Sequence, residues 1–124
     1  MRNNELFLGA DGCRNGWIAA VIDRGGLHLE RYETISAVIE RYPVYSAFLI
    51  DMAIGLRDSA EQIRPDDAAR KELGKRASTI FSIPCREAVY AEDASAQKQA
   101  NINALGKSLA VQTMAIIPKI KELD

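Results

Sequence analysis

Two aspartates, Asp11 and Asp51, are the residues of this chain best suited to chemistry, because each stands directly after an apolar run typical of a strand. Asp11 follows residues 6–10, and Asp51 follows residues 47–50. If these runs are neighbouring parallel strands, both carboxylates emerge at the same edge of one sheet. Two carboxylates that close repel each other unless a proton or a cation lies between them. The pair therefore predicts a site for Mg²⁺ or Mn²⁺.

A third acid would complete a nuclease-like arrangement. Cleavage of a phosphodiester by two metal ions needs one carboxylate that bridges the ions and further acids that hold each ion. Asp11 is the expected bridge and Asp51 its neighbour, and Asp66 or Asp67 would supply a third ligand from the start of a helix. The catalytic candidates are thus Asp11, Asp51 and Asp66. In the plainer interpretation, Asp11 begins a hairpin, Asp51 caps a loop and Asp66 is an ordinary acid of a first helical turn.

Basic side chains predict where a phosphate group would bind. Residues 64–86 hold six basic side chains against three acidic ones. Guanidinium groups bind phosphate through two parallel hydrogen bonds, which favours arginine for this role. The substrate-binding candidates are Arg14, Arg70, Arg76, Arg86 and Lys119. A solvated helix face with pairs of opposite charge, and a lysine that extends to solvent, are the alternative interpretations.

The order of the elements predicts how these residues are positioned. The chain opens with three strand-like runs joined by Gly-containing turns: residues 6–10, 17–23 and 27–32. Thr34 is expected to cap a short helix that ends before Pro43. Residues 45–50 are nearly continuous in apolar side chains, which favours a strand buried on both faces.

The second half of the chain is predicted to be mainly helical. Pro65 and the two acids after it predict a helix that ends near Leu73. Residues 76–86 are expected to be irregular or weakly extended. Helix then resumes, with a break at Gly106, and residues 109–123 carry an apolar stripe in which Pro118 should introduce a kink.

This order predicts a mixed α/β fold of the ribonuclease H-like type, in which a three-strand antiparallel meander is followed by a parallel fourth strand and C-terminal helices. In that architecture the fourth strand pairs with the first through a right-handed crossover. The pairing would bring Asp11 and Asp51 together. Residues 1–124 are expected to form a single domain of this class, and an unrelated α+β domain is the alternative.

Composition narrows the function classes. The chain has 124 residues, of which 48% are hydrophobic and 27% charged, with a formal net charge of −1. No overall field attracts nucleic acid, so a polyanion site must be a local patch. No apolar run reaches the ~20 residues that span a bilayer, and the N-terminus lacks a signal-peptide core, so no membrane association is expected. Cys13 and Cys85 lack a short spacing, which favours reduced thiols and a cytoplasmic location over a disulfide.

Several segments resemble one known family. They are residues 9–17 (GADGCRNGW), 50–56 (IDMAIGL), 66–86 (DDAARKELGKRASTIFSIPCR), 90–91 and 106–124 (GKSLAVQTMAIIPKIKELD). The chain resembles proteins of unknown function, domain of unknown function family 429, which are regarded as predicted nucleases with a ribonuclease H-like fold. Ala53, Pro65 and Ala110 stand where the family usually has proline, cysteine and serine. The resemblance covers the N-terminal half to two-thirds of the family's length, so the domain is expected to be truncated.

Three functions stay open at this point. The first is a nuclease or phosphohydrolase that depends on Mg²⁺ or Mn²⁺ and acts on a nucleic acid or another phosphoester. The second is a nucleotide-phosphate-binding protein of the actin-like or sugar-kinase type, with residues 11–16 as the phosphate loop. The third is a catalytically inactive binding or assembly module. A fourth strand left at the sheet edge would also favour a homodimer, formed by strand pairing or by swapped C-terminal helices.

Overall fold

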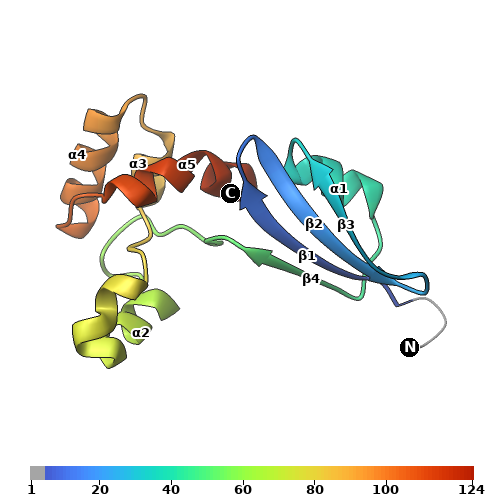
Figure 1. Ribbon diagram of the computed structural model, residues 1–124. Helices are drawn as coiled ribbons and strands as arrows, with labels where there is room; N and C mark the ends of the chain where they lie inside the picture. Colours follow the sequence, from blue (N-terminus) through green and yellow to red (C-terminus); the bar gives the residue numbers. More distant parts are fainter. Residues whose placement is uncertain (1–4) are drawn as a thin grey trace. The chain divides into compact units, whose positions relative to one another are not determined.

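The computed structural model describes residues 5–124, which divide into two compact units. The first unit ends at Met52 and includes Leu123, and the second contains Ala53–Glu122 and Asp124. The first unit is a sheet with one helix, whereas the second is built from helices (Figure 1). No helix among the described residues has the length and apolar character needed to cross a membrane.

The first unit contains a four-stranded mixed sheet in the order β3-β2-β1-β4. Its strands are β1 (Phe7–Cys13), β2 (Gly16–Asp23), β3 (Gly26–Tyr32) and β4 (Ala47–Asp51). The first three form an antiparallel meander, and β4 runs parallel to β1. This confirms the predicted mixed α/β class, the meander and the pairing of the fourth strand with the first.

Helix α1 (Ile35–Arg41) lies on one face of this sheet (Figure 1). Thr34 caps it as predicted, because its hydroxyl oxygen accepts a hydrogen bond from the Ala37 N–H at 3.2 Å. The helix contributes apolar side chains to the core of the unit. The buried members of this core are Leu8, Ala10, Trp17, Ala19, Val21, Ile35, Val38 and Tyr42.

A polar cluster around Glu30 joins β3 to the end of α1. The Glu30 carboxylate accepts hydrogen bonds from the hydroxyls of Tyr32 and of Tyr42, the latter at 2.8 Å. His28 Nε2 lies 3.4 Å from the other carboxylate oxygen. The two tyrosine hydroxyls stabilise the charged form and lower the pKa of Glu30. The cluster therefore fastens α1 to the edge of the sheet.

The opposite face of the sheet has no cover among residues 5–52. Strand register places Ile22, Leu27, Leu29 and Leu49 on this face. Leu49 is 75% exposed, so the prediction that residues 45–50 form a strand buried on both faces is wrong. The physical reason is that no element among residues 5–52 covers this face of the sheet, where Ile22, Leu27 and Leu29 are exposed as well.

The second unit begins with an irregular segment and then α2 (Pro65–Leu73), which has the predicted bounds. The expectation of irregular structure over 76–86 is wrong at both ends. A 3₁₀ helix, η1 (Gly74–Thr79), occupies the first part, and α3 (Arg86–Tyr90) begins at the last residue. The guanidinium of Arg70 donates to carbonyls at the end of η1, which stabilises this short turn.

Two longer helices follow, α4 (Ala94–Leu105) and α5 (Val111–Leu123). Gly106 ends α4 as predicted, since its φ of 70° is a left-handed conformation that suits glycine. Helix α5 continues across Pro118, and its apolar stripe is buried at Ile117 and Ile120. Val111, the first residue of α5, is 72% exposed.

Candidate metal site

Asp11 and Asp51 are direct neighbours across the parallel pairing of β1 and β4. The register runs from Phe7 beside Ala47 to Asp11 beside Asp51. Side chains that are partners in a ladder point to the same face of the sheet. Both aspartates are exposed, and both line one open cavity of about 420 Å³ on the face opposite α1. The two predicted metal ligands thus share one surface at the carboxyl ends of two adjacent parallel strands.

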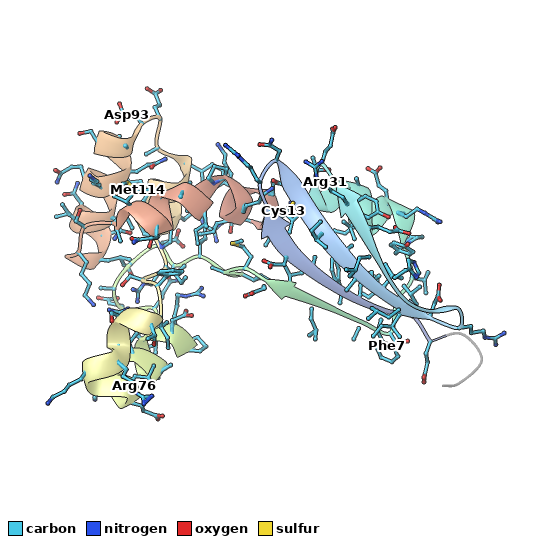
Figure 2. The ribbon with its side chains drawn as sticks, in the orientation of Figure 1. Phe7, Cys13, Arg31, Arg76, Asp93 and Met114 are labelled. Atoms are coloured by element: carbon cyan, nitrogen blue, oxygen red, sulfur yellow. The ribbon has the colours of Figure 1, made fainter. Side chains whose placement is uncertain are left out.

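A basic residue, Arg31, completes the same row of side chains across the sheet. Asp11 is the partner of Ile18 on β2, and Ile18 is the partner of Arg31 on β3. Arg31 Nη2 donates to the carbonyl oxygens of Arg14 at 3.5 Å and Asn15 at 3.2 Å. Arg31, on β3, therefore stabilises the turn between β1 and β2. It lies at the same end of the sheet as Cys13, the last residue of β1 (Figure 2).

Glycine at position 16 is required for this turn. Asn15 has a φ of 64°, and Gly16 follows with a φ of 153°. A Cβ atom on Gly16 would lie 2.2 Å from the carbonyl oxygen of Tyr32, which no side chain tolerates. The close approach of β2 to β3 at this point fixes the register that places Asp11 in its row.

The donor set fits a hydrated divalent ion better than a site made only of protein ligands. Among residues 5–124, no group of three or more His, Cys, Asp or Glu side chains is placed to hold one ion. Mg²⁺ is commonly held by one or two carboxylates together with waters and substrate phosphates. Structural zinc takes four protein ligands. Asp11 and Asp51 provide the two carboxylates of a magnesium-type site.

The third acid, Asp66, belongs to the second unit and has a partner there. Arg64 Nε lies 2.7 Å from Asp66 Oδ2. Arg64 also donates to the carbonyls of Ile54 and Gly55, so this ion pair fastens the start of α2 to the segment before it. Asp67 forms an ion pair with Arg57, which also belongs to the segment before α2. The catalytic role of Asp66 stays a prediction.

Two of the predicted phosphate-binding arginines lie on α2 and η1. Arg70 Nη1 donates to the carbonyl oxygens of Ala77, at 2.8 Å, and Ile80. Arg76 is exposed, and its guanidinium has no ion-pair partner within residues 5–124. The Arg70 guanidinium thus stabilises the backbone at the end of η1, whereas the Arg76 side chain is exposed to solvent.

The other three candidates are spread over both units. Arg86 forms ion pairs with Asp58, at 3.3 Å, and with Asp124. Lys119 lies 3.4 Å from Glu122 on the same helix. Arg14 is exposed in the β1–β2 turn, next to the row that contains the aspartates. Arg14 is therefore the candidate that shares a unit with Asp11 and Asp51.

Arg31 is the residue of this site that the sequence interpretation missed. A signal for it was present, because Arg31 alternates in phase with Leu27 and Leu29 along one strand. Combined with a two-residue turn between the first two strands, that phase would have placed Arg31 on the face of Asp11.

The mixed sheet and the paired strand-end aspartates describe an α/β domain of the ribonuclease H-like topology. The family model for the protein of unknown function DUF429 matches residues 9–124. The chain therefore belongs to the DUF429 family. The search found no match among curated proteins and none among solved structures.

Proposed function

We propose that this protein is a divalent-metal-dependent phosphoesterase, with nucleic acid or another phosphoester as substrate. The observation that carries the proposal is the placement of Asp11 beside Asp51 on one face, at the carboxyl ends of two parallel strands. Ligand sites of open α/β sheets lie outside those strand ends.

The chain's own residues supply charge and position. Two carboxylates on one surface create a local negative potential that attracts a divalent cation and leaves room for waters and a phosphate oxygen. A bound Mg²⁺ or Mn²⁺ would act as a Lewis acid on the phosphoester. Arg31 and Gly16 hold the β1–β2 turn, and Arg14 offers a guanidinium beside the row for a phosphate oxygen.

The test is metal binding and hydrolysis by matched variants. Mn²⁺ titration calorimetry on the wild type should show a site that Asp11→Asn and Asp51→Asn each weaken by at least about tenfold, the scale found for loss of supporting ligands. Asp23→Asn is the control, because it removes one carboxylate charge at the other end of β2 and keeps an oxygen for the Gly25 N–H.

Hydrolysis is measured on bis(p-nitrophenyl) phosphate and on short DNA and RNA. The proposal expects Mn²⁺-dependent product release that Asp11→Asn abolishes and the control variant keeps. Equal Mn²⁺ binding by the wild type and Asp11→Asn would refute the site. Metal binding without hydrolysis of any of these substrates would favour the inactive binding module.

The nucleotide-binding alternative has less support. Residues Gly12 and Cys13 are paired with β2, which leaves only Arg14 and Asn15 between the strands. The carbonyls of these two residues accept from Arg31. A backbone cradle for phosphate needs several free N–H groups, and this tight turn offers few.

We also propose that two copies associate through β4 in the cytoplasm. β4 is an edge strand of the described sheet, and edge strands invite pairing with another chain. Leu49 adds an exposed apolar side chain to this strand. The cytoplasmic location rests on the sequence, in which the two cysteines lack a short spacing. Light scattering at micromolar concentration should give twice the mass of one chain, and Leu49→Lys should shift it toward one. A single-chain mass for the wild type would refute the dimer.

A further inference from the structure

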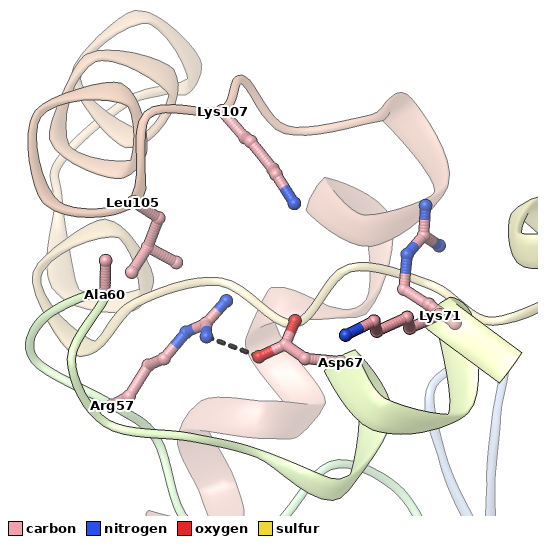
Figure 3. Close-up of a pocket in the computed structure, with 7 residues that line it drawn as sticks. Arg57, Ala60, Asp67, Lys71, Leu105 and Lys107 are labelled. Atoms are coloured by element: carbon pink, nitrogen blue, oxygen red, sulfur yellow. Dashed lines mark hydrogen bonds and ion pairs between the residues drawn. The ribbon is translucent and has the colours of Figure 1, made fainter.

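A pocket of about 450 Å³ in the second unit is lined by four cationic side chains and one carboxylate (Figure 3). These five residues, called the basic pocket below, are Arg57, Asp67, Arg70, Lys71 and Lys107. Their formal charge is +3. Ala60 and Leu105 add apolar surface to the lining. A concentration of one sign of charge around a cavity favours an anionic ligand.

Arg57 carries hydrogen-bonding capacity that the protein leaves unused. Its side chain is only 12% exposed, and Nη1 lies 2.6 Å from Asp67 Oδ2. The other terminal nitrogen, Nη2, points into the pocket in Figure 3 and has no acceptor among residues 5–124. Nε is buried and also lacks a partner within the described chain. The ion pair with Asp67 therefore holds Arg57 so that Nη2 can donate to an anion in the pocket.

The remaining cations keep their charge uncompensated. Arg70 donates to the neutral carbonyls of Ala77 and Ile80, which satisfy hydrogen bonds without neutralising the charge. The ammonium groups of Lys71 and Lys107 have no ion-pair partner in the part of the chain that the structure describes. Both side chains extend toward the Arg57–Asp67 pair (Figure 3).

A buried polar network fixes two walls of the pocket relative to each other. Asn101 is 1% exposed, and its amide nitrogen donates to the Lys107 carbonyl at 2.7 Å. Its amide oxygen accepts from the Cys85 N–H at 2.9 Å. The next residue, Arg86, donates its N–H to the Arg57 carbonyl at 2.9 Å. The backbone at Lys107 and at Arg57 is therefore tied to the same short segment.

We propose that the basic pocket binds a phosphate group carried by an organic ligand. Three uncompensated cations suit a phosphate dianion better than a single carboxylate, and Arg57 Nη2 can donate to one phosphate oxygen. The volume lies within the range of small-molecule sites, and Ala60 and Leu105 suit the less polar remainder of a ligand. The pocket shares no residue with the Asp11–Asp51 site, so this binding requires no metal. A mononucleotide and the backbone of a single-stranded nucleic acid both offer this chemistry.

Calorimetry with EDTA at low ionic strength tests the proposal, since chelation removes any contribution from a metal site. The probes are inorganic phosphate, AMP and a short single-stranded oligonucleotide. The test variant is K71M/K107M, which removes two charges and keeps side-chain length. The control is K75M/K98M, which removes the same charge from exposed positions on η1 and α4 outside the pocket. Circular dichroism checks that both variants are folded.

The expected result is saturable binding that K71M/K107M weakens at least tenfold and K75M/K98M changes less than twofold. One AMP per chain, bound at least as tightly as the oligonucleotide, identifies a mononucleotide site. Tighter oligonucleotide binding with a strong salt dependence identifies a backbone site. Absence of saturable binding for all three probes, or equal affinity of the two double variants, would overturn the proposal. Neither result depends on whether Asp11 and Asp51 hold a metal.

Discussion

Replacing Asp11 with asparagine should stabilise the first unit in the absence of metal, although it removes a residue of the proposed site. Asp11 and Asp51 are register partners on neighbouring strands, which lie about 4.8 Å apart. Two unit charges roughly 5 Å apart in bulk water repel by about 0.8 kcal/mol. Both side chains are exposed, so the water value applies. Asp11→Asn should therefore raise the free energy of unfolding by roughly 0.5–1 kcal/mol.

Urea unfolding followed by tryptophan fluorescence measures this effect. Trp17 is the single tryptophan of the chain and is fully buried in the first unit, opposite Gly12 on β1. Its signal therefore reports the unit that contains the mutation. The gain should shrink in 1 M salt, where the Debye length falls to about 3 Å.

Mn²⁺ should reverse the order of stability. A ligand that binds only the folded state adds about 2.7 kcal/mol at a concentration one hundred times its Kd. The wild type should gain this amount and Asp11→Asn little, so the wild type becomes the more stable protein. Asp23→Asn should show neither the salt-sensitive gain nor the reversal. A metal-free Asp11→Asn protein that is less stable than the wild type would refute the reasoning, as would a wild type that Mn²⁺ leaves unchanged.

Three further predictions concern the scaffold. Gly16→Ala should destabilise the first unit by about 3 kcal/mol or more, seen in urea unfolding, because the new Cβ would meet the Tyr32 carbonyl oxygen at 2.2 Å. The hydrogen bonds from Tyr32 and Tyr42 lower the pKa of Glu30, so they stabilise the fold fully at pH values above 4.5, the ordinary pKa of glutamate. This stability is lost as the pH falls through the lowered pKa. Glu30→Gln should flatten that part of the curve of stability against pH, and an unchanged curve would exclude the cluster as the cause. Asn101→Ala should cost the second unit roughly 1–3 kcal/mol in thermal unfolding, because the buried N–H of Cys85 loses its acceptor, and it should also weaken phosphate binding. Full-strength phosphate binding in a folded Asn101→Ala variant would exclude its positioning role.

The arrangement of the sheet could be predicted because it depends on local patterns. Gly-containing turn sequences between runs typical of strands predicted the first three strands, and the apolar run before Asp51 predicted a fourth. Strand pairing then placed Asp51 beside Asp11, and the capping role of Thr34 followed from its side-chain oxygen. Whether the aspartates hold a metal stays a prediction, since strand register fixes neighbours and not occupancy.

The features that were missed depend on contacts between residues distant in sequence. Leu49 is exposed because no element among residues 5–52 covers its face of the sheet, and an apolar run does not reveal whether both faces of its strand are covered. The 3₁₀ helix that begins at Gly74 is stabilised by hydrogen bonds from the Arg70 side chain, which the helix propensities of its own residues do not predict. Arg57 and Lys107 line one pocket only through the buried amide of Asn101 and its neighbours.

A crystal soaked in Mn²⁺, with the anomalous signal of the metal recorded, tests the central claim most directly. The account predicts an anomalous peak in contact with carboxylate oxygens of both Asp11 and Asp51, on the sheet face opposite α1. The peak should be absent from an Asp11→Asn crystal soaked in the same way. A wild-type crystal with both carboxylates ordered and no peak between them would contradict the metal site.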